Sequence, residues 1–581
     1  MNRAPHNVWA PVPPRVNDPG DTGCSENTSS LGIITVKLVY AFTTPLRPLF
    51  HPHLCSDLRT MFGSKQRPRG LIPAADVRRR GHTGVLMVVF SAFGGLLFGH
   101  DIGTISGVLR MDNWLRTFGD PVAGKQNGTD AVHFALPTSL ESVVVSILFA
   151  GTFFGALSAA PVGDVLGRRI GTMLSCLVFS LGVALQTGAP NLPTFILGRF
   201  FAGSGVGLVS TLVPIYQSEC APKWIRGFVI ASYQWAVTIG TLVASVINNA
   251  TKDRRDHSAW RIPIALQLVW AFLLFVGMLW LPESPRWLIK RERDIVATRS
   301  LARLTNLAED HPEVQAEVKE IRAALKRENM MGRGTYQDCF RSSNKTALRT
   351  CSGIAVLALQ QLAGVVFISS YGTTFFADAG IKNPFFVSIV VNIVQMGMAV
   401  PGLWGVEKLG RRPLLIGGGI AMALCGYTIA ILGVVTSFQD LATQKAVIGL
   451  VCVYFAAYAT SWGPVGWVVP NEIIPLNIRA KAMSLSVAIH WLCTWAVSFA
   501  SPYLANSGPG DAGLGVRIFF IWGSTTASAA LFTYLFIPET SGVSLEQIDL
   551  LYENWTPGLR AGYRPSLLVK DRAHVSEASV E

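Results

Sequence analysis

Asp101 is an ionisable residue with apolar sequence on both sides, which is an unfavourable setting for a charge. It lies within an apolar stretch near 85–109, where a charged group is expensive unless it faces a cavity or a partner. Arg199, in another apolar stretch, carries the opposite charge. A movement of one group relative to the other would let Asp101 take up and release a proton. The neighbouring His100 could modify this proton chemistry, or it could simply pack between helices.

Other chemistries lack residues to support them. The sequence contains no nucleophile elbow, P-loop or metal-ligand cluster in a suitable context. The nine cysteines form no Cys-x-x-Cys pair, and four of them fall inside apolar stretches, as packing residues do. We therefore expect no enzymatic activity, no metal and no cofactor, with a proton as the possible coupling ion.

Apolar blocks of about twenty residues, the length that crosses a bilayer as a helix, must position these groups. Half of the 581 residues are hydrophobic and only 15% are charged. A soluble helix seldom stays uncharged for so long, so we predict an all-α membrane protein. The twelve predicted transmembrane helices are 85–109, 140–162, 170–189, 194–216, 228–249, 262–281, 352–377, 385–405, 414–437, 446–470, 481–504 and 516–537.

The basic residues indicate which side the loops face. Lys and Arg lie in alternate short loops between the apolar blocks, which membrane topology explains better than a nucleic-acid partner does. We therefore place the basic loops and both termini in the cytoplasm, and we expect no nucleic acid to bind despite the net charge of +13. The opposite side would carry two glycosylation sequons in loops, Asn127-Gly128-Thr129 and Asn249-Ala250-Thr251.

Composition divides the chain into five segments. The first is rich in Pro, Arg, Ser and His, and is either a disordered tail or an extension absent from the mature protein. The stretch between the sixth and seventh spans has the charge pattern of amphipathic surface helices. The predicted segments are a cytoplasmic tail at 1–80, a six-helix bundle at 81–281, a cytoplasmic helical linker at 282–350, a second six-helix bundle at 351–537 and a cytoplasmic tail at 538–581.

The two predicted halves repeat one charged pattern. An acid, a glycine turn and two arginines follow both the second and the eighth span, and an acid, a proline and an arginine recur at equal spacing after the fourth and the tenth. Such groups can form ion pairs that break when one half rocks against the other. Alternatively they are topology signals and surface ion pairs worth about 0–1 kcal/mol each. The candidate gating residues are Asp164, Arg168, Arg169, Glu219, Arg226, Glu283, Arg286, Glu407, Arg411, Arg412, Glu472 and Arg479.

An ordered set of motifs between about residues 85 and 545 resembles one known family. The motifs are Gly94-Gly95-Leu96-Leu97-Phe98-Gly99-His100-Asp101-Ile102-Gly103, Gly198-Arg199-Phe200, Pro214-Ile215-Tyr216, Pro282-Glu283-Ser284-Pro285-Arg286-Trp287-Leu288, Gln360-Gln361-Leu362-Ala363-Gly364 and Pro538-Glu539-Thr540-Ser541-Gly542. The set is similar to that of the sugar porters of the major facilitator superfamily, and within them the fungal hexose transporters. This resemblance implies the major facilitator fold, with two six-helix halves and a cytoplasmic helical loop between them.

The resemblance also implies a sugar site. Sugar hydroxyls need amide side chains, and the apolar face of the ring needs an aromatic one. The implied contacts are Gln234, Gln360, Gln361, Gln395, Trp467, Trp491, Thr494 and Tyr371. The chain departs from the family where Val366, Gln395 and Thr494 stand at positions that usually hold Asn. A sugar as the substrate class is therefore more secure than glucose in particular.

The function implied by the resemblance is transport of a monosaccharide, most simply a hexose, by alternating access. In family members that couple sugar to protons, residues matching Asp101 and Arg199 carry the coupling. An uncoupled facilitator and a non-transporting sugar sensor are the alternatives, although the tail of about forty residues after Thr540 is short for a sensor. We expect a multi-pass protein of the plasma membrane that acts as a monomer in the lipid bilayer.

Overall fold

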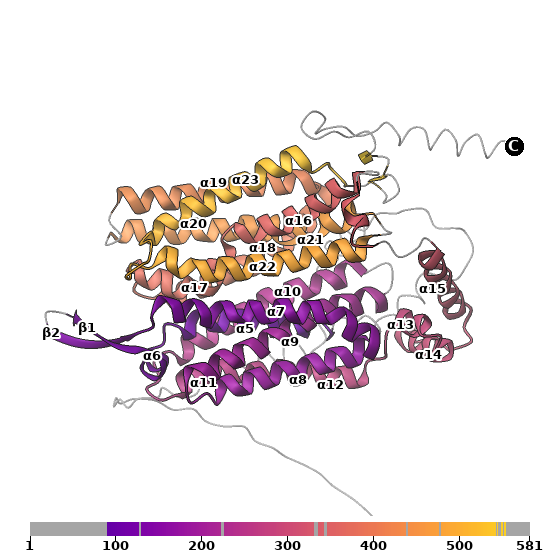
Figure 1. The fold of residues 1–581 in the computed structure, drawn as a ribbon, viewed down its shortest axis with the longest axis horizontal. Helices are drawn as coiled ribbons and strands as arrows, with labels where there is room; N and C mark the ends of the chain where they lie inside the picture. The colour runs from indigo at the N-terminus through magenta and orange to yellow at the C-terminus, as the bar shows by residue number, and fades with distance from the viewer. Residues whose placement is uncertain are drawn as a thin grey trace, which may run out of the picture. The chain divides into compact units, whose positions relative to one another are not determined.

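The fold is described from a computed structural model that covers residues 90–552, apart from 127–128, 222–225, 331–334, 342–344, 437–439, 476–477, 542, 544–547 and 550. The predicted tail at 1–80 lies outside the described residues, as does most of the tail at 538–581. The described part is almost entirely helical (Figure 1).

Seven described helices form the spans of the first half. They are α5 (Phe93–Val108), α7 (Thr138–Leu166), α8 (Arg168–Thr187), α9 (Leu192–Cys220), α10 (Arg226–Thr251), α11 (Ser258–Ala265) and α12 (Gln267–Trp280), the last two together forming the sixth span. Between the first two spans lie the short helix α6 (Asp112–Phe118) and an antiparallel hairpin of β1 (Asp120–Gln126) and β2 (Thr129–Ala135). The hairpin was not predicted from the sequence.

The second half repeats this arrangement with two broken spans. Its helices are α16 (Thr346–Leu362), α17 (Val365–Asp378), α18 (Pro384–Lys408), α19 (Arg411–Val435), α20 (Leu441–Thr460), α21 (Trp462–Ile473), α22 (Arg479–Ala505) and α23 (Ile518–Phe536). The linker between the halves forms α13 (Pro285–Lys290), α14 (Asp294–Thr305), α15 (Pro312–Met330) and the 3-10 turn η1 (Asp338–Phe340). A second 3-10 turn, η3 (Gly515–Arg517), precedes α23.

Among the described residues, ten helical segments are long and apolar enough to cross a membrane. Each coincides with a predicted span, and α5 and α10 lie at the two remaining predicted positions. α5 is described over only 16 residues, and α10 carries several polar side chains. Large apolar side chains such as Phe272, Trp280 and Val435 are exposed on the outer faces of the spans, as expected of surfaces that face lipid.

The two ends of the bundle differ. Figure 1 places the β1–β2 hairpin at one end of the helices and α13–α15 at the other. We name these the hairpin end and the linker end. The repeated charged motifs lie at the linker end, where α7 meets α8 and α18 meets α19.

The structure corrects one expectation about the hairpin end. Asn249-Ala250-Thr251 was expected in a loop, but it forms the last turn of α10, and Thr251 is buried with its hydroxyl bonded to the carbonyl of Ile247. The apolar block ends before this point, but the helix continues because packing against α5 stabilises its last turn. Asn248 contributes by donating to the carbonyl oxygens of Gly103 and Thr104.

Glycines let α5 approach α10 closely. A Cβ atom at Gly99 would lie 1.9 Å from the carbonyl oxygen of Val237, far inside van der Waals contact. Small residues at helix crossings give membrane helices their close packing, because apolar lipid provides no hydrophobic drive for association. The glycine-rich motif of α5 is therefore a packing surface that positions Asp101.

Gly99→Ala should destabilise the protein by about 1–3 kcal/mol, because the added methyl overpacks this crossing. Gly449→Ala on α20 is the matched control, since a Cβ there meets no described atom within 4 Å. For each variant, the fraction of protein that stays monodisperse in detergent is measured as a function of temperature. Equal midpoints for the two variants would contradict the packing role of Gly99.

Candidate functional site

Asp101 and Arg199 form an ion pair buried inside the first half. Arg199 Nη1 on α9 lies 3.0 Å from Asp101 Oδ1 on α5, and the two side chains are 1% and 0% exposed. Arg199 Nε also donates to the Val144 carbonyl of α7 at 3.3 Å. Removing one partner would leave a buried charge without compensation, which is far more costly than losing a surface pair. The pair therefore links three spans of one half.

His100 is held as a neutral imidazole. The indole N–H of Trp270 on α12 donates to His100 Nδ1 at 2.8 Å, and His100 Nε2 lies 3.1 Å from the carbonyl oxygen of Pro263 on α11. An indole N–H can only donate and a carbonyl can only accept, so the single ring proton must be on Nε2. These bonds join α5 to the sixth span. They support the helix-packing interpretation of His100.

The paired glutamines lie at a break in the second half. Gln360 Nε2 donates to the carbonyl oxygens of Trp462 at 2.7 Å and Gly463 at 3.1 Å, where α20 gives way to α21. These carbonyls belong to the first turn of α21, so the Gln360 amide ties α16 to the start of that helix and finds its own acceptors inside the protein. Gln361 lies beside it and accepts from Thr494 Oγ1 of α22 at 3.2 Å. Gln360 thus stabilises the break, and Gln361 and Thr494 form a polar pair next to it.

An aromatic cluster adjoins this polar pair. The ring of His490 lies 4.9 Å from Trp467 on α21 and 5.0 Å from Trp491 on α22. Trp491 in turn makes an edge contact with Phe98 of α5, 5.8 Å away in the other half. The cluster therefore lies where the two halves meet.

His490 is a candidate that the sequence analysis missed. Its ring is 6% exposed, and its Nδ1 has no hydrogen-bond partner among the described residues. A buried ring nitrogen without a partner in a polar and aromatic wall is suited to meet a ligand hydroxyl. The available signal was a histidine next to Trp491 within an apolar span, similar to the polar residues that were selected.

The other predicted contacts are more scattered. Gln234 on α10 is exposed and Gln395 on α18 is half-buried, and no hydrogen bond among the described residues joins either to Gln361. Tyr371 is buried on α17 and donates to the Ser498 carbonyl at 2.9 Å. Val366 is half-buried on α17, the helix that follows the Gln pair in the chain. The structure brings together Gln360, Gln361, Thr494, Trp467 and Trp491, and their role in binding stays a prediction.

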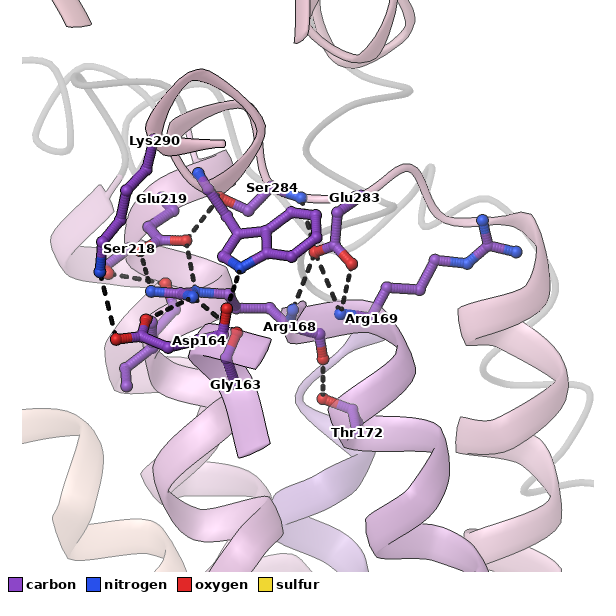
Figure 2. Close-up of polar contacts among 12 residues, drawn as sticks. Gly163, Asp164, Arg168, Arg169, Thr172, Ser218, Glu219, Glu283, Ser284 and Lys290 are labelled. Carbon is purple, nitrogen blue, oxygen red and sulfur yellow. Dashed lines mark hydrogen bonds and ion pairs between the residues drawn. The ribbon is translucent and has the colours of Figure 1, made fainter. Parts of the chain in front are cut away.

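The charged motif of the first half forms one network at the linker end (Figure 2). Arg168 Nε lies 3.1 Å from Glu219 Oε2, and Arg168 Nη1 lies 3.1 Å from Asp164 Oδ1. Lys290 of the linker lies 3.1 Å from the other Asp164 oxygen. Figure 2 shows the Arg168 side chain extending between the two acids. The network ties α7, α8 and α9 to α13.

Glu283 caps the helix that begins in this network. Its carboxylate accepts the backbone N–H groups of Arg168 at 2.9 Å and Arg169 at 3.1 Å at the start of α8. An acid at a helix N-terminus satisfies free N–H groups and complements the helix dipole. Burial raises the pKa of Glu283, while these N–H donors and that of Ser284 act in the opposite direction. The charged form of Glu283 is therefore stabilised by the N–H groups that it caps.

The second half repeats the central part of this network. Arg411 lies 3.0 Å from Glu472 and 3.6 Å from Glu407. Glu539 accepts the backbone N–H groups of Arg411 at 3.1 Å and Arg412 at 3.0 Å, as Glu283 does in the first half. Glu539 was absent from the predicted gating set, although Pro-Glu-Ser after the sixth span and Pro-Glu-Thr after the twelfth pointed to it.

A tight turn precedes each capped helix. Gly167 and Gly410 have φ angles of 96° and 94°, in the region that favours glycine. A Cβ at either position would also meet the capping carboxylate, at 2.3 Å from Glu283 Oε2 and 2.7 Å from Glu539 Oε2. Both features explain why each charged motif contains glycine immediately before its arginine pair.

The remaining gating candidates are placed differently. Arg169 and Arg412 donate to carbonyls at the ends of the sixth and twelfth spans, and Arg479 donates to the Ile474 carbonyl at 3.1 and 2.9 Å. Arg286 lies on α13, and the side chain of Arg226 lies outside the described residues. The described ion pairs at this end join partners within one half, within the linker, or between the first half and the linker. They hold each half together.

Comparison with known proteins agrees with this architecture. Residues 87–552 match the family described as Sugar (and other) transporter. The chain belongs to the sugar transporter family. Its fold is accordingly the major facilitator fold of twelve transmembrane helices in two six-helix halves, with a helical loop between them.

Several relatives of the sugar transporter family are similar over most of the chain. The chain is 47% identical to the major facilitator-type transporter ecdD of Aspergillus rugulosus, covering 81% of this chain and 87% of that protein. It is 41% identical to the probable glucose transporter rco-3 of Neurospora crassa, with coverage of 81% and 79%. It is 39% identical to the high glucose sensor RGT2 of Saccharomyces cerevisiae over 81% of this chain, but it spans only 60% of that protein.

Solved structures of the xylose transporter XylE from E. coli share the fold. The inward open conformation has a TM-score of 0.64 at 26% identity, covering 80% of this chain and 99% of XylE. A second structure is described as the proton:xylose symporter XylE bound to 6-bromo-6-deoxy-D-glucose. Its TM-score is 0.65 at 26% identity, covering 81% of this chain and 100% of XylE.

Glu539→Ala and Glu283→Ala should each lower the free energy of unfolding by about 1 kcal/mol or more, because each removes a half-buried cap and helix-dipole partner. Glu407→Ala is the control, because Glu407 is 74% exposed in its pair with Arg411 and should change stability little. Denaturation midpoints in detergent measure the difference. A Glu407→Ala loss as large as the Glu539→Ala loss would contradict the capping role.

Proposed function

We propose that this protein carries a monosaccharide, most simply a hexose, across a membrane by alternating access and couples it to a proton. The observation that carries the proposal is the polar and aromatic cluster of Gln361, Thr494, His490 and Trp491, which contacts Phe98 of the other half. A ligand bound at that junction would touch both halves, so their relative movement would transfer it from one side to the other.

The chemistry of the cluster suits a sugar. Gln361 and Thr494 provide hydrogen-bonding groups for hydroxyls, and the Trp467 and Trp491 rings provide faces for the apolar side of a pyranose. His490 adds a ring nitrogen in a wall that lacks the asparagines expected at positions 366 and 494. The named activities of the relatives include glucose and xylose transport. These names support monosaccharides as the substrate class more strongly than any particular sugar as the substrate.

Proton coupling is assigned to Asp101 and Arg199. The buried pair is 3.0 Å apart and connects α5, α7 and α9. Protonation of Asp101 would remove the charge that Arg199 compensates, so it would change the free energy of every arrangement that keeps them together. The alternative is an uncoupled facilitator in which the pair is structural.

Sidedness follows from the basic loops. The linker end carries Arg168, Arg169, Arg411 and Arg412, so the positive-inside rule places it and both termini in the cytoplasm. The hairpin end then faces outward. We infer a plasma-membrane protein that functions as a monomer, in the lipid bilayer and with a sugar as its partner.

A sugar sensor is the second candidate, because RGT2 is 39% identical over 81% of this chain. A sensor would bind sugar without flux. Reconstituted vesicles separate the two, since a transporter equilibrates labelled sugar across the vesicle membrane. Binding without equilibration would favour the sensor.

Asp101→Asn should abolish accumulative, pH-dependent uptake of labelled hexose in a host that lacks hexose transport, because the amide cannot carry the proton. Exchange of sugar at equal concentrations should persist if the site is intact. Asp253→Asn, in an exposed loop, is the control and should behave as the parent. Accumulation by Asp101→Asn with an unchanged pH profile would show that the protein does not couple through this residue.

His490→Ala should raise the KM for sugar uptake about tenfold, because a hydrogen bond lost in a desolvated site costs about 1–3 kcal/mol. His490→Asn should restore much of the affinity, since an amide can also bond a hydroxyl. His311→Ala on the linker controls for histidine loss. An unchanged KM in His490→Ala would remove this residue from the binding site.

A further inference from the structure

The two halves touch differently at the two ends of the bundle. At the linker end, the described ion pairs of the charged motifs stay within one half or reach the linker. At the hairpin end, side chains of the two halves bond directly to each other. Lys252 Nζ of the first half donates to Asn383 Oδ1 of the second at 3.0 Å, and lies over the ring of Phe385.

Four residues form the most connected of these contacts, which we name the hairpin-end clasp: Thr138 and Glu141 of α7, with Asn506 and Asp511 just after α22. Asn506 Nδ2 donates to Glu141 Oε2 at 3.0 Å and contacts Thr138 Oγ1 at 3.4 Å. Thr138 Oγ1 donates to Asp511 Oδ2 at 2.7 Å. The backbone N–H of Gly508 also donates to Asp511 Oδ2, at 3.0 Å, and holds that acid in place.

The clasp joins the first turn of α7 to the chain that leaves α22. These two helices pack along each other beneath it. The three side-chain bonds between the halves exist only while the two helix ends are together. Separation of the halves at this end would therefore break all three at once and expose their groups to water.

We propose that the hairpin-end clasp is the outer gate of the transport cycle, and that Thr138 and Glu141 are the residues of the first half that hold it shut. This inference rests on the proposed function, and it adds specific gating residues to it. The structure is then the state closed at the hairpin end.

The chemistry of the clasp suits repeated opening. Its donors to the carboxylates of Glu141 and Asp511 are a neutral amide and a hydroxyl, whereas Arg168 and Arg411 pair two full charges to hold each half together. A hydrogen bond to a carboxylate shifts an equilibrium by about tenfold or more.

The central prediction concerns the population of the open state. A contact made only in the closed state stabilises that state, so its loss must shift the population toward the open one. Thr138→Val removes a donor and an acceptor at nearly constant volume. Glu141→Ala removes the main acceptor of Asn506, whereas Glu141→Gln keeps an amide oxygen there and should retain most of the closure.

A buried serine offers a reporter. Ser142 lies one turn after Thr138 on α7, is fully buried, and its hydroxyl has no partner among the described residues. Ser142→Cys should therefore be tolerated and shielded while the gate is shut. The full-length protein with Ser142→Cys is expressed in intact cells and labelled with a membrane-impermeant maleimide, with the parent lacking this cysteine as background.

We expect Thr138→Val and Glu141→Ala each to raise the labelling rate of Ser142→Cys about tenfold. Glu141→Gln and Thr428→Val should leave it near the starting rate. Thr428 is a matched hydroxyl that bonds only to the Leu424 carbonyl of its own helix, α19, among the described residues. Equal labelling rates in all five proteins, or equal acceleration by Thr428→Val, would overturn the proposal.

Labelling needs neither sugar nor a proton gradient, so it separates this inference from the proposed function. If no variant transports a sugar but the two clasp variants label faster, the gate stands and the transport assignment fails. If the parent transports sugar and the clasp variants label at the parent rate, the transport assignment stands and the gate fails. Size-exclusion profiles identify any variant that does not fold. If one of the two clasp variants fails this test, the labelling rate of the other tests the gate.

Discussion

A polar group inside a bilayer must find its partner within the protein, because the hydrocarbon provides none. This constraint accounts for the positions of the charged and amide side chains in the spans. Asp101 meets Arg199, His100 lies between an indole donor and a carbonyl acceptor, and the Gln360 amide donates to carbonyls in the first turn of α21. The polar residues left incompletely paired are then the best candidates for meeting a ligand, as at His490.

The same constraint separates strong contacts from weak ones. Charged networks at the linker end tie the helices of each half together, with Glu283 and Glu539 as equivalent caps. The contacts named between the halves at the hairpin end each pair one charged group with a neutral amide or hydroxyl, whereas the networks at the linker end pair opposite charges. A molecule built in this way can keep each half intact while the halves separate and meet again. That division of strength is what alternating access requires.

Much of the fold followed from the sequence because long apolar blocks can have only one stable form in lipid. The twelve spans and the helical linker are confirmed on this basis. The breaks at Gly364 and Ser461 were not predicted, since an interruption stabilised by distant residues leaves no change in hydrophobicity. The Asn249-Ala250-Thr251 sequon was wrongly assigned to a loop for a related reason, because contacts with α5 extend α10 beyond its apolar part.

The site was predicted less completely. The acids and arginines of the charged motifs could be selected from their repetition, but only the fold shows that their pairs lie within a half, or that Glu539 matches Glu283. His490 was missed because a single histidine in an apolar span does not show its neighbours. The binding and coupling roles of the predicted residues stay predictions.

Reciprocal movement of the two ends is the central claim, and distances between spin labels in reconstituted protein test it most directly. One label pair at Ser139 and Ser507 reports the hairpin end, and another at Val165 and Leu409 reports the linker end; all four residues are exposed. On adding a transported hexose, the two distance distributions should shift in opposite directions. A shift of both in the same direction, or of neither, in protein that transports the sugar would contradict alternating access by these two halves.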